Sequence, residues 1–200
     1  MKEVKKLVVG ALSTNSYLLI EDNHCIIVDP GANPKRILEN VQGLIVDAIC
    51  LTHGHFDHIK AVDALVKELK CDVYISEYDD EMLKDSRKNA SILIGQPFTV
   101  NSKVKYYDTI TKIRNFEFNV VEASGHTKGS VLLLIDNIMF AGDVLFQGGI
   151  GRTDLYGGSN SQMRATLNEI SKLAKDYIVY SGHGEDTTLF EEFKNNPYLR

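Results

Sequence analysis

The chain has 200 residues, of which 44% are hydrophobic and 24% charged, so we expect a single globular domain over residues 1–200. Its net charge of −5 disfavours nucleic acid as the main partner, because phosphate binding requires a positive surface. Residues 1–6 lack the apolar core of a signal peptide, and no apolar run is long enough to span a membrane. We therefore expect a cytoplasmic protein without a membrane partner.

The first part of the chain predicts a β-meander. Strands are expected over residues 4–9, 17–20 and 25–28, with residues 13–16 as the first turn. The third strand ends at Asp29-Pro30-Gly31, a turn that places a carboxylate at the strand end. A helix is expected to follow, because Asn33 suits the N-cap and Pro34 suits the first helical position.

The middle of the chain alternates short apolar runs with helical patterns. We expect a strand over 48–51, an amphipathic helix over 59–70, a strand over 72–75 and a short acidic helix over 77–84. Residues 85–115 are hard to interpret. They contain an apolar, insertion-like segment, 91–95, and two candidate short strands, 104–106 and 109–113.

The last part again begins with strands and ends with helices. Strands are predicted over 116–122, 131–135 and 138–141, then a glycine-rich loop over 147–158. A helix over 161–175, a strand over 177–180 and a helix ending near Asn195 complete the chain. This order favours an α/β fold in which two mixed sheets pack face to face with helices on both outer faces.

Histidines and aspartates gather where apolar, strand-like runs end. Eight residues share this placement: Asp29, His53, His55, Asp57, His58, His126, Asp143 and His183. Neutral imidazole and carboxylate are good ligands for zinc, iron and manganese. His53 and His55 alternate along an extended loop and can bind one ion, while Asp57 and His58 begin a helix and suit a second. His126 and His183 would complete the two sets, and Asp143 would bridge the ions.

The segment Thr52-His53-Gly54-His55-Phe56-Asp57-His58, followed by Gly125-His126-Thr127, Gly142-Asp143 and Ser181-Gly182-His183-Gly184, resembles the metallo-β-lactamase superfamily. Residues 142–146 and 151–155 are more particularly similar to short glyoxalase II-like hydrolases and the related persulfide dioxygenases. The resemblance implies an αββα four-layer sandwich. It also implies that His53, His55 and His126 hold one metal, that Asp57, His58 and His183 hold the other, and that Asp143 bridges them.

The activity implied by the resemblance is thioester hydrolysis. The substrate would be a small-molecule thioester of a low-molecular-weight thiol, similar to S-lactoylglutathione. Two divalent ions, with zinc expected and iron or manganese as alternatives, would share the attacking hydroxide, and Asp57 would orient it.

Other activities stay open beside this one. The main alternative is a mononuclear iron persulfide dioxygenase that holds its metal with His53, His126 and Asp143. A lactonase, another esterase, a nuclease and a non-enzymatic metal-binding protein are further alternatives. The commoner zinc β-lactamases resemble the chain less, because they have Cys at the position of Asp143. The sequence does not define the oligomeric state.

Several residues near the motifs have two readings. Asp29 either fixes a ligand loop or a ligand tautomer, or serves only as a turn residue before Pro30. Thr52 and Thr127 either hydrogen-bond to ligands and carbonyls or cap turns. Lys60, where the superfamily commonly has a small residue, is expected to reach solvent.

The glycine-rich loop also carries candidate substrate residues. Arg152 either contacts an anionic substrate group or braces the loop through Asp154, and we favour bracing. Gln147 and Tyr156 are expected to line the mouth of the pocket.

Overall fold

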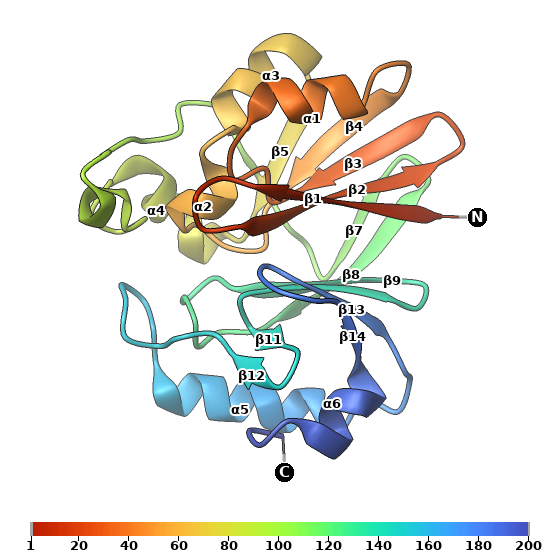
Figure 1. The fold of residues 1–200 in the computed structure, drawn as a ribbon, viewed down its shortest axis with the longest axis vertical. Coiled ribbons are helices and arrows are strands. Elements are labelled where there is room, and N and C mark those ends of the chain that lie inside the picture. The colour runs from red at the N-terminus through yellow and green to blue at the C-terminus, as the bar shows by residue number, and fades with distance from the viewer. Residues whose placement is uncertain (1, 200) are drawn as a thin grey trace.

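Two six-stranded mixed sheets pack face to face, and helices cover the outer face of each (Figure 1). The structure is a computed structural model that describes residues 2–199. The four-layer αββα arrangement expected from the sequence is confirmed. Within the described residues, no helix is long and apolar enough to cross a membrane.

The first sheet begins with antiparallel strands and continues with parallel ones. Its order is β1 (Glu3–Val9), β2 (Thr14–Glu21), β3 (His24–Val28), β4 (Ile45–Cys50), β5 (Asp72–Ile75) and β6 (Lys105–Tyr106), and pairing is parallel from β3 onward. Its connections contain α1 (Pro34–Asn40), α2 (Phe56–Ile59), α3 (Val62–Leu69), η1 (Glu77–Asp79), α4 (Asp80–Lys84) and η2 (Ser91–Ile94).

The second sheet contains one parallel pair, β10 and β13, among antiparallel neighbours. Its order is β14 (Thr187–Thr188), β13 (Ile178–Ser181), β10 (Ile138–Gly142), β9 (Val131–Ile135), β8 (Phe116–Glu122) and β7 (Ile110–Ile113). A small hairpin, β11 (Leu145–Phe146) and β12 (Gly149–Ile150), precedes α5 (Asn160–Ile170), and the chain closes with α6 (Leu189–Asn195).

Three apolar cores separate the four layers. In β2, Leu18 packs in the core beneath the helices of the first sheet, while Tyr17 and Leu19 pack in the core between the sheets. In β9, Leu133 faces that central core and Leu132 faces α5 and α6. Successive residues of a strand point to opposite faces, and here both faces are covered, so β9 is apolar at every position and β2 is apolar from Tyr17 to Ile20.

Two expectations about the N-terminal region are wrong. The first turn spans residues 10–13 instead of 13–16, because Thr14 pairs with Val9 and Ser16 with Leu7 in the β1–β2 ladder. The helix begins at Pro34 as predicted, but Asn33 has φ 53° and does not cap it. Its side-chain oxygen instead accepts a hydrogen bond from the Gly10 amide at 2.8 Å, which fixes the first turn.

The predicted helices at 59–70 and 161–175 also differ. The first is divided between α2 and α3, because the amide of Ala61 donates to the carbonyl of Pro30 at 2.9 Å instead of continuing the helical bonds. The second ends at Ile170, where the amides of Lys172 and Leu173 bond carbonyls only three residues back.

Candidate metal centre

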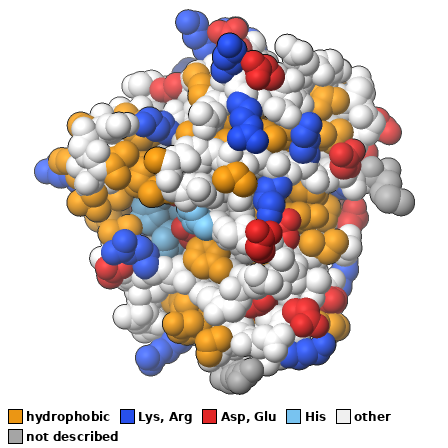
Figure 2. Space-filling view, in the orientation of Figure 1, with side chains coloured by type: hydrophobic (Ala, Val, Ile, Leu, Met, Phe, Trp, Pro, Cys, Tyr) orange, Lys and Arg blue, Asp and Glu red, His pale blue; other side chains and the backbone are white. Residues whose placement is uncertain are grey.

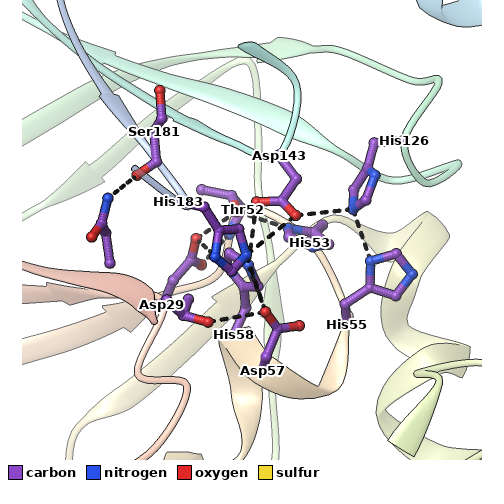
Figure 3. A network of polar contacts seen from close by, with 12 residues as sticks. Asp29, Thr52, His53, His55, Asp57, His58, His126, Asp143, Ser181 and His183 are labelled. Carbon is purple, nitrogen blue, oxygen red and sulfur yellow. Dashed lines mark hydrogen bonds and ion pairs between the residues drawn. The ribbon is translucent and has the colours of Figure 1, made fainter. Parts of the chain in front are cut away.

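The candidate ligands lie at one end of the sandwich, where the parallel strands of both sheets finish. Asp29 follows β3 and the loop 51–55 follows β4 in the first sheet. Asp143 follows β10 and the loop carrying His183 follows β13 in the second. Because parallel strands bring their carboxyl ends to one edge, side chains distant in sequence meet there (Figure 3).

The first cluster consists of His53, His55 and His126, which are all buried. One ring nitrogen from each lies within 4.8 Å of the others, and His55 Nδ1 is 2.8 Å from His126 Nε2. Burial and the neighbouring imidazoles hold the pKa of His53 well below its usual value. Burial likewise lowers the pKa of His55 to about 3. Both imidazoles are therefore neutral near pH 7 and have lone pairs available for a metal.

The second cluster consists of Asp57, His58 and His183. Asp57 Oδ2 lies 3.1 Å from His183 Nε2 and 3.6 Å from His58 Nε2. Burial opposes the charged form of His58, but Asp143, Asp57 and Asp29 outweigh it and raise its pKa well above the usual value. The three carboxylates around His58 therefore favour positive charge at this position.

Asp143 lies between the two clusters (Figure 3). Its Oδ1 is 3.3 Å from His58 Nε2, and its Oδ2 is 3.5 Å from His126 Nε2 and 3.6 Å from His183 Nε2. Burial would raise the pKa of Asp143, but His58, His126 and His183 lower it below the usual value. The group is therefore a carboxylate that faces both clusters, as a bridging ligand requires.

Hydrogen bonds to the far side of each ring set the histidine tautomers. Three rings donate from Nδ1: His58 to Asp29 at 3.0 Å, His126 to the Arg152 carbonyl at 2.7 Å and His183 to the Leu12 carbonyl at 3.1 Å. These acceptors place a proton on Nδ1, so Nε2 is the nitrogen of each ring that faces the site and could bind a metal.

Asp29 connects two of the candidate ligand histidines. It accepts from the Thr52 amide at 2.8 Å, the Thr52 hydroxyl at 2.6 Å and His58 Nδ1. Since the Thr52 hydroxyl donates to Asp29, its oxygen can accept from His53 Nδ1, which lies 3.0 Å away. Asp29 is buried and has φ 48°, a strained backbone for a residue with a Cβ. These contacts make Asp29 and Thr52 supports of His53 and His58.

The unsatisfied polar atoms of the site fit a divalent metal. Five buried side-chain atoms within residues 2–199 lack a hydrogen-bond partner, and four belong here: His53 Nε2, His55 Nε2, His58 Nε2 and Asp143 Oδ1. Leaving such an atom unpaired costs about 1–3 kcal/mol. Imidazole nitrogens and carboxylates arranged in this way form a suitable donor set for zinc, iron or manganese.

Asp79 is a buried residue of the site that the sequence did not identify. It accepts from the Gly54 amide at 2.9 Å, the Thr127 hydroxyl at 2.7 Å and the Gly129 amide at 2.8 Å. Gly54 separates His53 from His55, and Thr127 follows His126, so Asp79 joins the loops of the first cluster. It stands in an acidic stretch, residues 77–81, where nothing in the pattern marks it from its neighbours.

Thr14 and Asn15 were also missed, because they were assigned to a turn. The Thr14 hydroxyl donates to Asp57 Oδ2 at 2.9 Å. Asn15 Nδ2 donates to the carbonyls of Ser181 at 3.0 Å and Gly184 at 2.9 Å, on either side of His183. The start of β2 therefore positions two parts of the second cluster: Asp57, and the loop that carries His183.

The remaining candidates lie on the glycine-rich loop. Arg152 donates to both oxygens of Asp154 at 2.7 Å, and this ion pair braces the glycine-rich loop. The Tyr156 hydroxyl donates to Glu81 at 2.7 Å, which ties the same loop to α4. Gln147 is exposed in the turn between β11 and β12.

Lys60 is exposed, as expected, and its side chain also has partners on a neighbouring segment. Its Nζ donates to Gln96 Oε1 at 2.7 Å, and the ammonium lies 6.0 Å from the centre of the Phe98 ring. The side chain is thereby attached to the segment that follows η2.

The fold and the site together define a metal-dependent enzyme whose ligands come from loops of two packed sheets. A family model described as "Metallo-beta-lactamase superfamily" matches residues 9–183, and the chain belongs to that superfamily.

Two of the relatives are described as hydrolases. The chain is 35% identical to "Probable metallo-hydrolase YqgX" of Bacillus subtilis, over 98% of this chain and 96% of that protein. It is 31% identical to "Hydroxyacylglutathione hydrolase GloC" of Haemophilus influenzae, over 96% of this chain and 95% of that protein.

Two solved structures have the same fold over nearly their whole length. The structure of BLEG-1, described as a B3 metallo-beta-lactamase, has a TM-score of 0.94 and 37% identity and covers 98% of this chain and 99% of its own. The structure of TTHA1623 in a di-iron-bound form has a TM-score of 0.89 and 32% identity, covering 98% and 100%. Together with the candidate ligands, these findings support a metal-dependent hydrolase.

Proposed function

We propose that the protein is a dinuclear hydrolase that cleaves thioesters of a low-molecular-weight thiol. The observation that carries this proposal is the position of Asp143, whose two oxygens lie 3.3–3.6 Å from ring nitrogens of both clusters. A carboxylate in this position suits two adjacent cations better than one. The relative described as a hydroxyacylglutathione hydrolase supports a thioester as the substrate.

Seven side chains would hold the two ions. His53, His55 and His126 form one set, Asp57, His58 and His183 form the other, and Asp143 belongs to both. Zinc is the metal expected for this donor set, and the di-iron form of TTHA1623 makes iron the first alternative. When bound, such ions supply Lewis acidity that polarises a carbonyl and lowers the pKa of water.

The protein's own groups would position the reactants. Burial would raise the pKa of Asp57, but His58, His183 and the hydrogen bond from Thr14 lower it below the usual value, so Asp57 remains a carboxylate. Asp57 can therefore accept a hydrogen bond from the attacking water and orient it. The water oxygen adds to the thioester carbon, the carbon–sulfur bond breaks, and a carboxylic acid and a free thiol leave.

The test compares two histidine variants on a panel of small thioesters that includes S-lactoylglutathione. His55→Ala is expected to lower kcat/KM by at least about 100-fold, because it removes one ligand of the first set. His24→Ala is the matched control, since His24 pairs with Asp47 away from the site, and it should hydrolyse thioesters like the wild type. A folded His55→Ala protein with wild-type activity would contradict the proposal.

β-Lactam hydrolysis is the second candidate, because the BLEG-1 structure covers almost all of this chain at 37% identity. The same ligands could serve it, since a lactam carbonyl is attacked by water in the same way. Hydrolysis of nitrocefin at a kcat/KM above that of every thioester in the panel would replace the thioester proposal by this one.

A mononuclear iron dioxygenase is the third candidate. It would use His53, His126 and Asp143, and the 3.5 Å between His126 Nε2 and Asp143 Oδ2 permits this. Metal analysis separates the cases: one iron per chain, with oxygen uptake on glutathione persulfide, would overturn the dinuclear hydrolase.

A further inference from the structure

A cavity adjoins the second cluster on the side of α2. Its volume is about 220 Å³, and it reaches Thr14 and Asp57. Most of its other walls are apolar: Val9, Ala11, Leu12, Ala32, Phe56 and Ile94. An apolar cavity of about 150 Å³ is sufficient to hold benzene, so this one can accept a group of that size or larger.

The mouth of this cavity lies between two exposed apolar segments. Leu12, in the turn between β1 and β2, is 51% exposed. Ile94, in η2, is 42% exposed, and its neighbour Leu93 is 71% exposed. Figure 2 shows hydrophobic side chains gathered beside the exposed histidine surface. Scattered exposed apolar residues are ordinary, but a group of them next to a reactive site indicates ligand binding.

The η2 segment is held in place by buried polar contacts. Asn89 Oδ1 accepts from the Ser91 amide at 2.9 Å, and the Ser91 hydroxyl accepts from the Phe98 amide at 3.1 Å. The Asn89 carbonyl also accepts from the amide of Phe56, inside the metal-binding motif. Ala90 has φ 66°, a strained value that persists only where surrounding contacts enforce it. The wall is therefore preformed and tied to the motif.

The cationic group at the cavity, the Lys60 ammonium, is already paired. Lys60 and Gln96 both line it, and they hydrogen-bond to each other at 2.7 Å. An apolar group can enter without leaving this ammonium unpartnered, which would be costly.

We infer that this cavity binds an apolar alkyl or aryl group of the substrate, carried on either the acyl or the thiol side of the thioester. The enzyme is then selective for thioesters that are more apolar than the lactoyl compound. The catalytic part of this inference rests on the proposed thioester hydrolysis, while the binding part does not.

Two substrate series test the inference on the metal-loaded protein. One series varies the acyl chain of N-acetylcysteamine thioesters from acetyl to hexanoyl, and the other varies the thiol of acetyl thioesters from ethanethiol to hexanethiol. We expect kcat/KM to rise about two- to fourfold per methylene in one series, which identifies the side that occupies the cavity. Ile94→Ser should abolish most of this increase. Ile110→Ser, at an exposed position of β7 in the other sheet, is the matched control and should retain the increase.

Calorimetric titration with amide analogues of both series provides a readout independent of turnover. The hexyl analogue of one series should bind at least about tenfold more tightly than its shortest member, with a negative heat-capacity change, and Ile94→Ser should remove the difference. Affinities independent of chain length in both series would overturn the cavity assignment even if thioesters are hydrolysed. Chain-length-dependent binding without hydrolysis of any thioester would refute the proposed function and retain the cavity.

Discussion

At the scale of single residues, the site depends on buried carboxylates that contact no reacting group. Asp79 accepts three hydrogen bonds from the loops that carry His53, His55 and His126. Burial raises its pKa, although the three donors oppose that change. Because its partners come from both sheets, Asp79 acts as a positioning residue for the first cluster.

Asp79→Asn tests this role. The amide nitrogen would face at least one of three donors, which is expected to cost about 1–3 kcal/mol of unfolding free energy and to loosen the first cluster. We expect a lower urea midpoint for the metal-free protein and less metal retained after dialysis. Asp80→Asn removes the adjacent carboxylate, which pairs with Lys84 on α4, and should retain its metal. Equal metal retention in the two variants would contradict the positioning role.

Only some residues of the site could be predicted from the sequence. The histidines were identifiable because imidazole at a strand end, repeated five times, has few structural uses. Asp79 and Thr14 were not, because an aspartate in an acidic stretch and a threonine near a turn are common on any surface. Their roles depend on which loops pack against them, and that information is tertiary.

Loop glycines fix how closely the elements approach at the site. A Cβ on Gly182 would lie 2.2 Å from Asp143 Oδ1 and 2.7 Å from His58 Cε1. Real atoms do not approach so closely, so the loop after β13 requires glycine to let Asp143 reach both clusters.

Gly182→Ala is therefore expected to displace Asp143 and reduce the bound metal to one ion per chain or fewer. Thioester hydrolysis should fall by about 100-fold or more, as displacement of a positioned group commonly does. Gly149→Ala is the control, since a Cβ there meets no atom within 4 Å. Elemental analysis of the two purified proteins decides the outcome, and two ions per chain in Gly182→Ala would refute the steric argument.

Asp63 gives α3 a pH-dependent attachment. Its carboxylate accepts from the amides of Asn101 and Ser102 and from the Ser102 hydroxyl, at 2.6–3.1 Å. Burial would raise its pKa, but these donors outweigh it and lower the pKa below the usual value. The stabilisation is therefore present above the pKa of the unfolded chain, about 3.9, and is lost as pH falls through the lower folded value.

Asp63→Asn should accordingly destabilise the metal-free protein at pH 7, and this destabilisation should shrink as the pH falls below about 3.9. Urea midpoints of wild type and variant, measured across this range, should converge as pH falls. A constant difference between the two proteins at all pH values would exclude the carboxylate as its cause.

The elements themselves were predictable where local pattern and tertiary setting agree. The strands 116–122 and 131–135 have the bounds expected, because the first alternates buried and exposed residues and the second is an unbroken apolar run that is buried throughout. The continuous helix expected over residues 59–70 does not form, because the hydrogen bond from the Ala61 amide to the Pro30 carbonyl divides it. The segment 91–95 resisted interpretation because its apolar residues face the cavity and solvent instead of a core.

For the whole molecule, the site is also a junction between the two sheets. The loop after β4 and helix α2 supply four candidate ligands, and the second sheet supplies His126, Asp143 and His183. Asn15 and Tyr17 of β2 cross the same junction, through hydrogen bonds to the Ser181 carbonyl at 3.0 Å and 2.6 Å. Any cation bound between these loops would therefore oppose separation of the sheets.

Because a cation bound between the two sheets would hold them together, metal removal should lower the thermal stability of the entire chain. A ligand present at 100 times its dissociation constant adds about 2.7 kcal/mol to the folded state. At roughly 2–4 °C per kcal/mol for a protein of this size, chelation is expected to lower Tm by about 5–10 °C. His183→Ala removes a ligand contributed by the second sheet, so chelation should lower its Tm by less. His24→Ala leaves the junction intact and should show the full decrease. If chelation lowered the Tm of wild type and His183→Ala equally, the cation would not link the two sheets through His183.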